Sequence, residues 1–202
     1  MIGNILRSAA LLSFSLSQSH LGGPETGGKR GLISGGAHSI GRVATAKFVG
    51  HCAKVAIANI QEQNGRELAD ELGSSAAFMR CNVSHESDFS DAVDFAVSSM
   101  AASMSIRGVG SVQALQAWFA VPTKFVMEEL KMMLPCLDDS HLMKIIRNSG
   151  VLKGANCETD NIANAALFLA SDVAKYVNGH NLTLDGGFTV MTNLEIPAPE
   201  DV

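Results

Sequence analysis

The chain has 202 residues, of which 47% are hydrophobic and 17% charged, and its formal net charge is −5. This composition is typical of a globular α/β domain with a sizeable core, and it excludes an intrinsically disordered chain. The acidic balance argues against nucleic-acid binding, and no apolar run is long enough for a transmembrane helix. We therefore expect neither nucleic acid nor membrane as a partner.

Residues 1–28 are predicted to be a leader and linker. The first twenty-odd residues contain no acid, one Arg and many Ser and Leu, a composition typical of an organelle transit peptide. We expect a mitochondrial or plastid protein, and the alternative is an unstructured leader on a cytoplasmic protein. At the other end, residues 193–202 are predicted to form a flexible tail, which leaves 29–192 as the domain.

The segment 31–60 organises the rest of the domain. A short apolar run at 31–33 leads into a glycine-rich turn, Ser34 to Gly41. A helix is predicted from about Ile40, followed by a second apolar run at 54–60. This pattern predicts a βαβ unit whose two strands are parallel. The helix would direct free N–H groups and its positive dipole end at the turn, which makes a phosphate site.

The next elements continue the alternation of strands and helices. A helix is predicted over 61–73 with Gly73 as its stop, then a strand over 76–83. A further helix begins after Ser84, and later helices are predicted over 127–133 and 160–172. The last strand is predicted over 181–184.

The four cysteines, Cys52, Cys81, Cys136 and Cys157, lie far apart in the sequence. None forms a CxxC pair, so neither a zinc site nor a disulfide framework is indicated. We expect free thiols and no metal site.

Two parts of the chain resemble the short-chain dehydrogenase/reductase family, in particular its plant secoisolariciresinol-dehydrogenase-like and xanthoxin-dehydrogenase-like group. Ser34-Gly35-xxx-Ser39-Ile40-Gly41 is similar to the Thr-Gly-xxx-Gly-Ile-Gly fingerprint of that family, and Ala53 to Gln61 is similar to its second strand. The similarity resumes at 162–172 and at 179–188. The resemblance implies a Rossmann-like, doubly wound parallel sheet. It also implies oxidoreductase activity that interconverts an alcohol and a ketone on a small plant metabolite.

The middle of the family domain has no counterpart in this sequence. The helix that starts after Ser84 runs almost directly into Ser105-Ile106-Arg107, which resembles the segment just before the family's sixth strand. Roughly eighty residues of the usual domain length are absent, including strands 4 and 5 and the adjoining helices. We expect strand 1 to be left with a bare inner edge, so that strand 6 closes up against it or the protein forms two loosely joined halves.

The resemblance also implies a cofactor site. Its predicted residues lie in the glycine turn and at the ends of the second and third strands: Gly35, His38, Ser39, Ile40, Gly41, Asn59, Ile60, Asn82 and Val83. Asn59 stands where NAD-preferring members carry Asp, and His38 where NADP-preferring members often carry a basic residue. Asn59 and Asn82 also fit an ordinary role as turn residues at strand ends. NAD is favoured as the dinucleotide, and NADP stays open.

No catalytic residue is predicted. The family's reaction uses a serine and a Tyr-xxx-Lys pair, in which the lysine lies one helical turn after the tyrosine and lowers its pKa. The one tyrosine here, Tyr176, is followed four residues later by His180, and Lys175 is adjacent to it. A packing role between the last helix and the last strand explains Tyr176 better.

Three hypotheses of function follow. The first is an oxidoreductase by descent that is impaired because its catalytic segment is absent. The second is a non-catalytic module that binds a dinucleotide, or that forms homo- or hetero-oligomers through its C-terminal helix and strand. The third is a truncated product without function. A small alcohol or ketone is expected as a partner only of an active enzyme.

Overall fold

The computed structural model describes residues 11–17, 29–99, 109–113, 121–148, 151–152, 154–174, 176–177 and 182–187. Within them, a five-stranded sheet has the strand order β4-β3-β2-β1-β5. The strands are β1 (Leu11–Ser17), β2 (Arg30–Ser34), β3 (Lys54–Asn59), β4 (Ala76–Arg80) and β5 (Val109–Gln113). Strands β2, β3 and β4 are parallel neighbours, whereas β1 is antiparallel to both β2 and β5.

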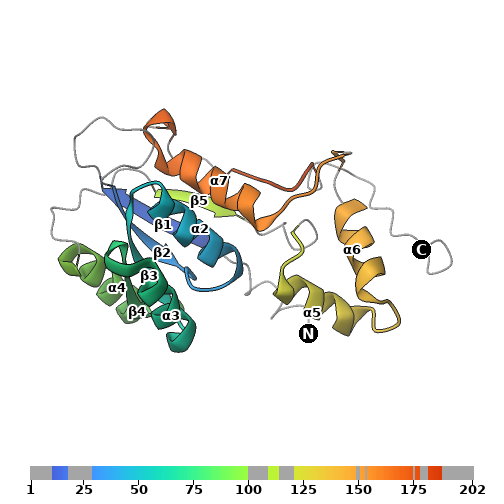
Figure 1. Ribbon diagram of the computed structural model, residues 1–202, viewed down its shortest axis with the longest axis horizontal. Coiled ribbons are helices and arrows are strands. Elements are labelled where there is room, and N and C mark those ends of the chain that lie inside the picture. The colour runs from blue at the N-terminus through green and yellow to red at the C-terminus, as the bar shows by residue number, and fades with distance from the viewer. Residues whose placement is uncertain are drawn as a thin grey trace.

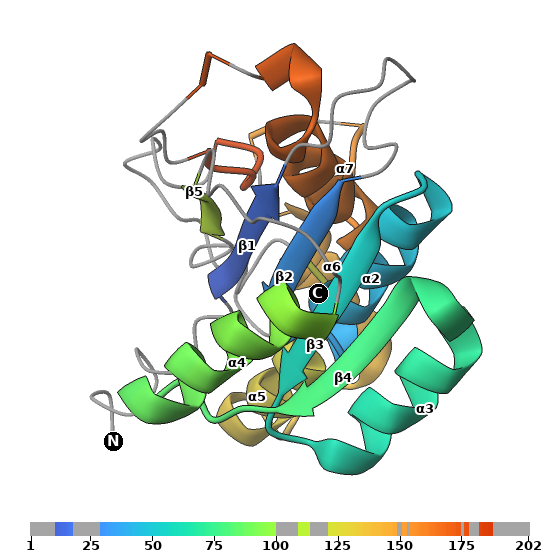
Figure 2. The ribbon, with the colours of Figure 1, turned by 90° about the vertical axis from the view of Figure 1, so that its left-hand side faces the viewer.

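The helices cover both faces of the sheet, as Figures 1 and 2 show. Helices α2 (Ser39–Gly50), α3 (Glu62–Leu72) and α7 (Thr159–Ala170) pack on one face, and α4 (Glu86–Ser99) packs on the other. The larger core lies between strands β2 and β3 and helices α2, α3 and α7. Ile33, Ile57 and Phe48 are fully buried there. Each such side chain contributes about 1.5–3 kcal/mol on burial. The doubly wound architecture is therefore confirmed.

Most element boundaries agree with the sequence patterns. β3 is buried along nearly its whole length, as expected for a strand covered on both faces. α3 ends at Gly73, whose φ of 62° lies in the region that glycine tolerates. α5 (Lys124–Met133) and α7 lie close to their predicted ranges, whereas α6 (Asp139–Asn148) was not predicted.

Two predictions are wrong. Residues 182–184 are described but form no strand, and Leu184 packs instead against the main core; residue 181 lies outside the described residues. The inner edge of the first parallel strand is also not bare. β1, from the segment predicted as a leader, pairs with β2 there, and β5 pairs with the other edge of β1. The predicted tail at 193–202 lies outside the described residues.

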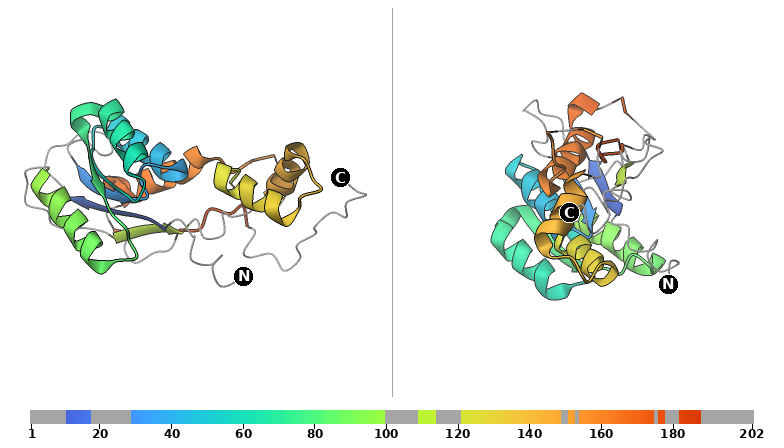
Figure 3. Two further views of the ribbon diagram at one scale, coloured as in Figure 1. Left: turned by 90° about the horizontal axis from the view of Figure 1, so that it is seen from below. Right: turned by 90° about the vertical axis from the view of Figure 1, so that its right-hand side faces the viewer.

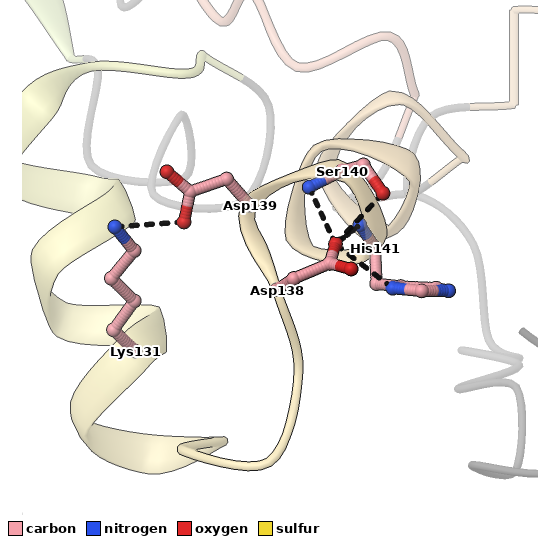
Figure 4. A network of polar contacts seen from close by, with 5 residues as sticks. All are labelled: Lys131, Asp138, Asp139, Ser140 and His141. Atoms are coloured by element: carbon pink, nitrogen blue, oxygen red, sulfur yellow. Dashed lines mark hydrogen bonds and ion pairs between the residues drawn. The ribbon is translucent and has the colours of Figure 1, made fainter.

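Helices α5 and α6 pack on each other beside the sheet and its helices, as Figure 3 shows. They share a small core of Val126, Leu130, Leu142 and Ile146. The Asp138 carboxylate caps the N-terminus of α6. It accepts hydrogen bonds from the backbone N–H groups of Ser140 and His141 at 2.8 and 3.0 Å. An ion pair of 2.7 Å joins Lys131 on α5 to Asp139 on α6 (Figure 4).

Candidate functional site

The glycine turn between β2 and α2 has the backbone geometry that its sequence predicts. Gly35 has a φ of 67°, and its N–H donates to the carbonyl of Ala58 at 2.8 Å, which ties the turn to β3. Gly41 lies directly against it, because a Cβ built on Gly41 would be 2.0 Å from the carbonyl oxygen of Gly35. Both glycines are therefore required for the turn to fold back on the helix.

The start of α2 is open towards the turn. His38 is extended and exposed and provides no side-chain cap, and no acidic residue lies in the first helical turn. The first N–H groups of a helix lack partners within the helix, and they carry its positive dipole end. Together these features suit an anion such as a phosphate. The side chain of Ile40 is buried in the main core, so only its backbone can face a ligand.

Ser39 adopts an unusual backbone conformation. Its φ is 50°, in the left-handed region that favours glycine. The family fingerprint has glycine at this position, and the structure explains why, since any side chain here raises the energy of the turn.

Two residues that support the turn, Thr45 and Gly36, were not assigned a role from the sequence. Thr45 is fully buried in α2, and its hydroxyl donates to the carbonyl of Gly36 at 2.9 Å. A Cβ on Gly36 would lie 3.0 Å from both this hydroxyl and the carbonyl oxygen of Ile33. No pattern marks Thr45 in the sequence, because it simply occupies one position of the buried helix face.

Asn59 ends β3 next to the turn and carries the most informative side chain of the site. It is 7% exposed, and its amide nitrogen Nδ2 is buried without a hydrogen-bond partner among the described residues. A buried donor without a partner costs about 1–3 kcal/mol. Such an atom is expected where a ligand supplies the missing acceptor, for example a ribose hydroxyl.

The ends of β3 and β4 present two exposed apolar side chains. Ile60 is 53% exposed and Val83 is 60% exposed. They follow neighbouring parallel strands, in which Asn59 is opposite Arg80. Asn82, which precedes Val83, accepts a hydrogen bond from the N–H of Ser84 at 3.1 Å and so stabilises the turn after β4. The side chains of Ile60 and Val83 are therefore open to solvent at the ends of neighbouring strands.

The structure thus brings every predicted cofactor residue to one edge of the sheet, at the carboxyl ends of β2, β3 and β4. In open α/β sheets this edge is where ligands bind. The thiol of Cys81 lies at the same edge, and burial, together with the Asp88 carboxylate, raises its pKa, so it stays uncharged at neutral pH. Among the described residues no group of His, Cys, Asp and Glu could hold a metal ion.

A cavity of about 380 Å³ lies elsewhere, between the end of α6, the start of α7 and residues 183–187. Its wall includes Ile146, Leu152 and Leu184, with Arg147 among its polar groups. The Cys157 thiol also lines it, and burial, with Glu158 and Asp185 nearby, raises the pKa of that thiol. The lining residues and those of the glycine turn do not overlap.

Tyr176 is 99% exposed and lies just beyond α7. The predicted packing role for this side chain is therefore wrong within the described residues. Among those residues, no helix is both long and apolar enough to cross a membrane.

Comparisons with known proteins give a family model and several relatives that are similar to this chain. A family model described as enoyl-(acyl carrier protein) reductase matches residues 130–189. Secoisolariciresinol dehydrogenase from Forsythia intermedia is 27% identical, over 83% of this chain and 91% of the relative. Borneol dehydrogenase, mitochondrial, from Lavandula x intermedia is 28% identical, over 81% of this chain and 92% of the relative.

The alignment with the Forsythia relative includes many positions that have no residue of this chain. It runs over 252 positions, whereas 83% of 202 residues is about 168 residues. Subtracting 168 from 252 leaves about 84 positions without a residue of this chain. This agrees with the expected absence of roughly eighty residues.

One solved structure supports the fold. The 3-ketoacyl-(acyl-carrier-protein) reductase from Brucella melitensis, complexed with NADH, superposes with a TM-score of 0.53 at 18% identity. The match covers 78% of this chain and 97% of that chain.

Proposed function

The chain belongs to the short-chain dehydrogenase/reductase family of oxidoreductases, and from that premise we propose that it binds NAD(H) at the glycine turn without efficient turnover. The observation that carries this proposal is the Nδ2 of Asn59, which has no hydrogen-bond partner among the described residues and is buried beside an open helix N-terminus. The phosphates would lie against the start of α2, and the adenine ring against Ile60 and Val83. The NADH complex of the Brucella neighbour supports the same choice of dinucleotide.

The proposal of impaired catalysis rests on the side chains that the sequence offers. Its one tyrosine is Tyr176, which is almost fully exposed and lies beyond the end of α7, and that end contacts Lys29 at the start of β2 rather than the carboxyl ends of the strands. The family chemistry needs a tyrosine and a lysine that touch the reacting oxygen beside the nicotinamide. We expect no measurable oxidation of NADH in the presence of a panel of ketones, and no reduction of NAD with alcohols. Turnover above the background rate would refute this part of the proposal.

If a small alcohol or ketone binds, the cavity beside α6 is the place we propose for it. Its volume and mainly apolar wall suit a molecule of terpenoid size. The cavity shares no lining residue with the glycine turn, which again favours binding without hydride transfer.

A change at Asn59 tests the cofactor site. The variant Asn59→Asp supplies a carboxylate that can accept from ribose hydroxyls, and charged hydrogen bonds exceed neutral ones by roughly 1 kcal/mol. We expect Kd for NAD(H) to fall several-fold and Kd for NADP(H) to rise, because the carboxylate repels a 2′-phosphate. Thermal unfolding with each dinucleotide, supported by calorimetric titration, measures both effects.

The matched control is Asn148→Asp, which adds the same charge at the exposed end of α6. It should leave both dissociation constants unchanged. The cofactor proposal fails if millimolar NAD(H) and NADP(H) leave the unfolding temperature of the unmodified protein unchanged, since saturation at about a hundred times Kd adds roughly 2.7 kcal/mol.

A dimerising module is the second candidate function. Exposed apolar residues gather on and just after α7, where Phe168 is 43%, Val173 79% and Val177 40% exposed. Light scattering of the purified chain, and of Phe168→Ser with Val173→Ser, tests this surface. A dimer that the double variant abolishes would favour self-association, and a monomer in both cases would leave only hetero-oligomers with family members.

The compartment remains a prediction. We propose a mitochondrial or plastid protein, with the cytoplasm as the alternative, because of the composition of residues 1–28, and targeting would then have to leave residues 11–17 in place because they pair within the sheet. A relative named as mitochondrial, from Lavandula x intermedia, supports the first choice. A fluorescent fusion at the C-terminus would distinguish the compartments.

A further inference from the structure

Strand β1 is an internal strand of the sheet rather than an edge strand. Phe14 is opposite Ile33 of β2 on one side and opposite Gly110 of β5 on the other. Four residue pairs join β1 to β2 and five join it to β5, so both edges of β1 are engaged. In this structure, β1 is the element that joins β5 to the parallel strands.

The site that β1 fills is created by the strands beside it. Because β1 is antiparallel to both neighbours, β2 and β5 run in the same direction. Without β1, each would present a row of unpaired N–H and C=O groups towards the other. Parallel strands are normally covered on both edges, and an open edge is a template for pairing with another chain. The family's central strands, which have no counterpart in this sequence, therefore do not fill this place, and the alignment with the Forsythia relative has about 84 positions without a residue of this chain.

We propose that the gap between β2 and β5 is a strand-acceptor site, and that residues 11–17 occupy it permanently as a donor strand of the same chain. Such recognition uses main-chain hydrogen bonds, which tolerate many sequences provided the strand is extended. The segment meets this condition, since it has no proline, glycine or charge. It also alternates Leu12, Phe14 and Leu16 with serines, the period-two pattern of a strand with two different faces.

The alternation agrees with the register. Position 14 is opposite Ile33, which belongs to the larger core, whereas position 15 is opposite Leu32, which belongs to the core beneath α4. Positions 14 and 16 of β1 therefore pair with residues 33 and 31 of β2, and positions 15 and 17 pair with residues 32 and 30. Consequently, the segment whose composition suggests a removable leader is a structural part of the folded protein. Cleavage after Ser17 would open the edges of both β2 and β5.

Proline substitution tests the pairing in the full chain. Ser13→Pro with Ser15→Pro removes two backbone N–H donors from a strand paired on both sides. We expect the urea midpoint to fall by about 1 M or more, and the amides of β2 to exchange faster with deuterium. The control Ser13→Thr with Ser15→Thr keeps the donors and favours strands, so its midpoint should not fall. An unchanged midpoint and unchanged exchange in the proline variant would overturn the proposal.

A cross-link tests the occupant and its register even if the proline variant fails to fold. Ser17 is directly opposite Arg30, a separation that a disulfide spans. We expect Ser17→Cys with Arg30→Cys to form an intrachain cross-link under mild oxidation, detected by peptide mass spectrometry. In the control, Ser15→Cys with Arg30→Cys, the cysteines are two residues out of register and should cross-link several-fold less. Equal yields in the two variants, or a cross-link formed only between chains, would refute a donor strand in cis.

Discussion

Single residues in the glycine turn determine whether the cofactor edge can form. The structure distinguishes glycines that are required from glycines that are incidental, which the sequence motif alone does not. Gly41 has no room for a Cβ, whereas a Cβ on Gly50, in the same helix, would meet nothing within 4 Å. This contrast gives a matched pair of substitutions.

We expect Gly41→Ala to destabilise the protein by more than about 1 kcal/mol and to abolish NAD(H) binding, because the new methyl group collides with the carbonyl of Gly35. Gly50→Ala should be neutral or slightly stabilising, because alanine favours the helix. Urea denaturation and a dinucleotide titration measure the two effects. Equal stability of the two variants would mean that the turn does not pack against α2 as described.

Ser39 provides the opposite case, in which a substitution should relieve strain. Replacing it by glycine removes the steric cost of its positive φ, and this gain exceeds the added entropy of the unfolded chain, so we expect a net stabilisation of roughly 0.5 kcal/mol. The same change at Ser90, an exposed position inside α4, should destabilise by about 0.5–1 kcal/mol. Thermal unfolding of both variants tests the prediction, which fails if the two changes have the same sign.

Among the elements, α6 depends on one carboxylate for its start. The Ser140 hydroxyl, the backbone N–H of His141 and the His141 imidazole contact the Asp138 carboxylate and hold its pKa well below its ordinary value (Figure 4). A depressed pKa in the folded state means that this carboxylate adds stability above its ordinary pKa. That contribution declines as the pH falls from the ordinary value towards the lowered one.

Asp138→Asn tests this dependence. The difference in stability between the natural protein and the variant should be full at neutral pH and should shrink only below a pH of about 4. Denaturant unfolding across this pH range measures it. Asp94→Asn, at an exposed position of α4, removes the same charge and serves as the control. A difference for Asp138→Asn that does not change with pH would contradict the capping role.

At the scale of the whole molecule, Lys29 links the first and last parts of the fold. It is 5% exposed, and its ammonium donates to the carbonyl of Ala170 at 3.0 Å and to Asp172 at 2.8 Å. It thereby fastens the start of β2 to the end of α7. An ion pair of 2.6 Å between Lys47 and Asp160 joins α7 to α2, its neighbour on the same face of the sheet.

We expect Lys29→Met to destabilise the protein by about 1–3 kcal/mol, because the buried carbonyl of Ala170 loses its donor. Lys54→Met, at an exposed position on the adjacent strand, should change the stability by much less. Urea midpoints of the two variants make the comparison. If the two midpoints agree, the end of α7 is not anchored through Lys29.

The order of the first three parallel strands and their helices could be predicted from the sequence, because apolar periodicity and glycine placement are local signals. The predicted cofactor residues could be placed at one edge of the sheet because the carboxyl ends of parallel strands lie at the same edge. Thr45 and Gly36 could not be found, because their roles arise from a contact across nine residues of turn and helix. The strand expected at 181–184 fails because pairing, rather than local sequence, defines a strand.

The sequence by itself determined the family, the βαβ unit and the absence of a Tyr-xxx-Lys pair, since each depends on residue identity and short spacing. Only the tertiary structure decided what covers the edge of β2. The composition of residues 11–17 indicates a leader. Leaving the backbone N–H and C=O groups of β2 without hydrogen bonds, however, costs more free energy than the local preference of this segment provides. The N-terminal segment removes this cost because its backbone supplies the missing donors and acceptors. No pattern within those seven residues predicts which strands they pair with.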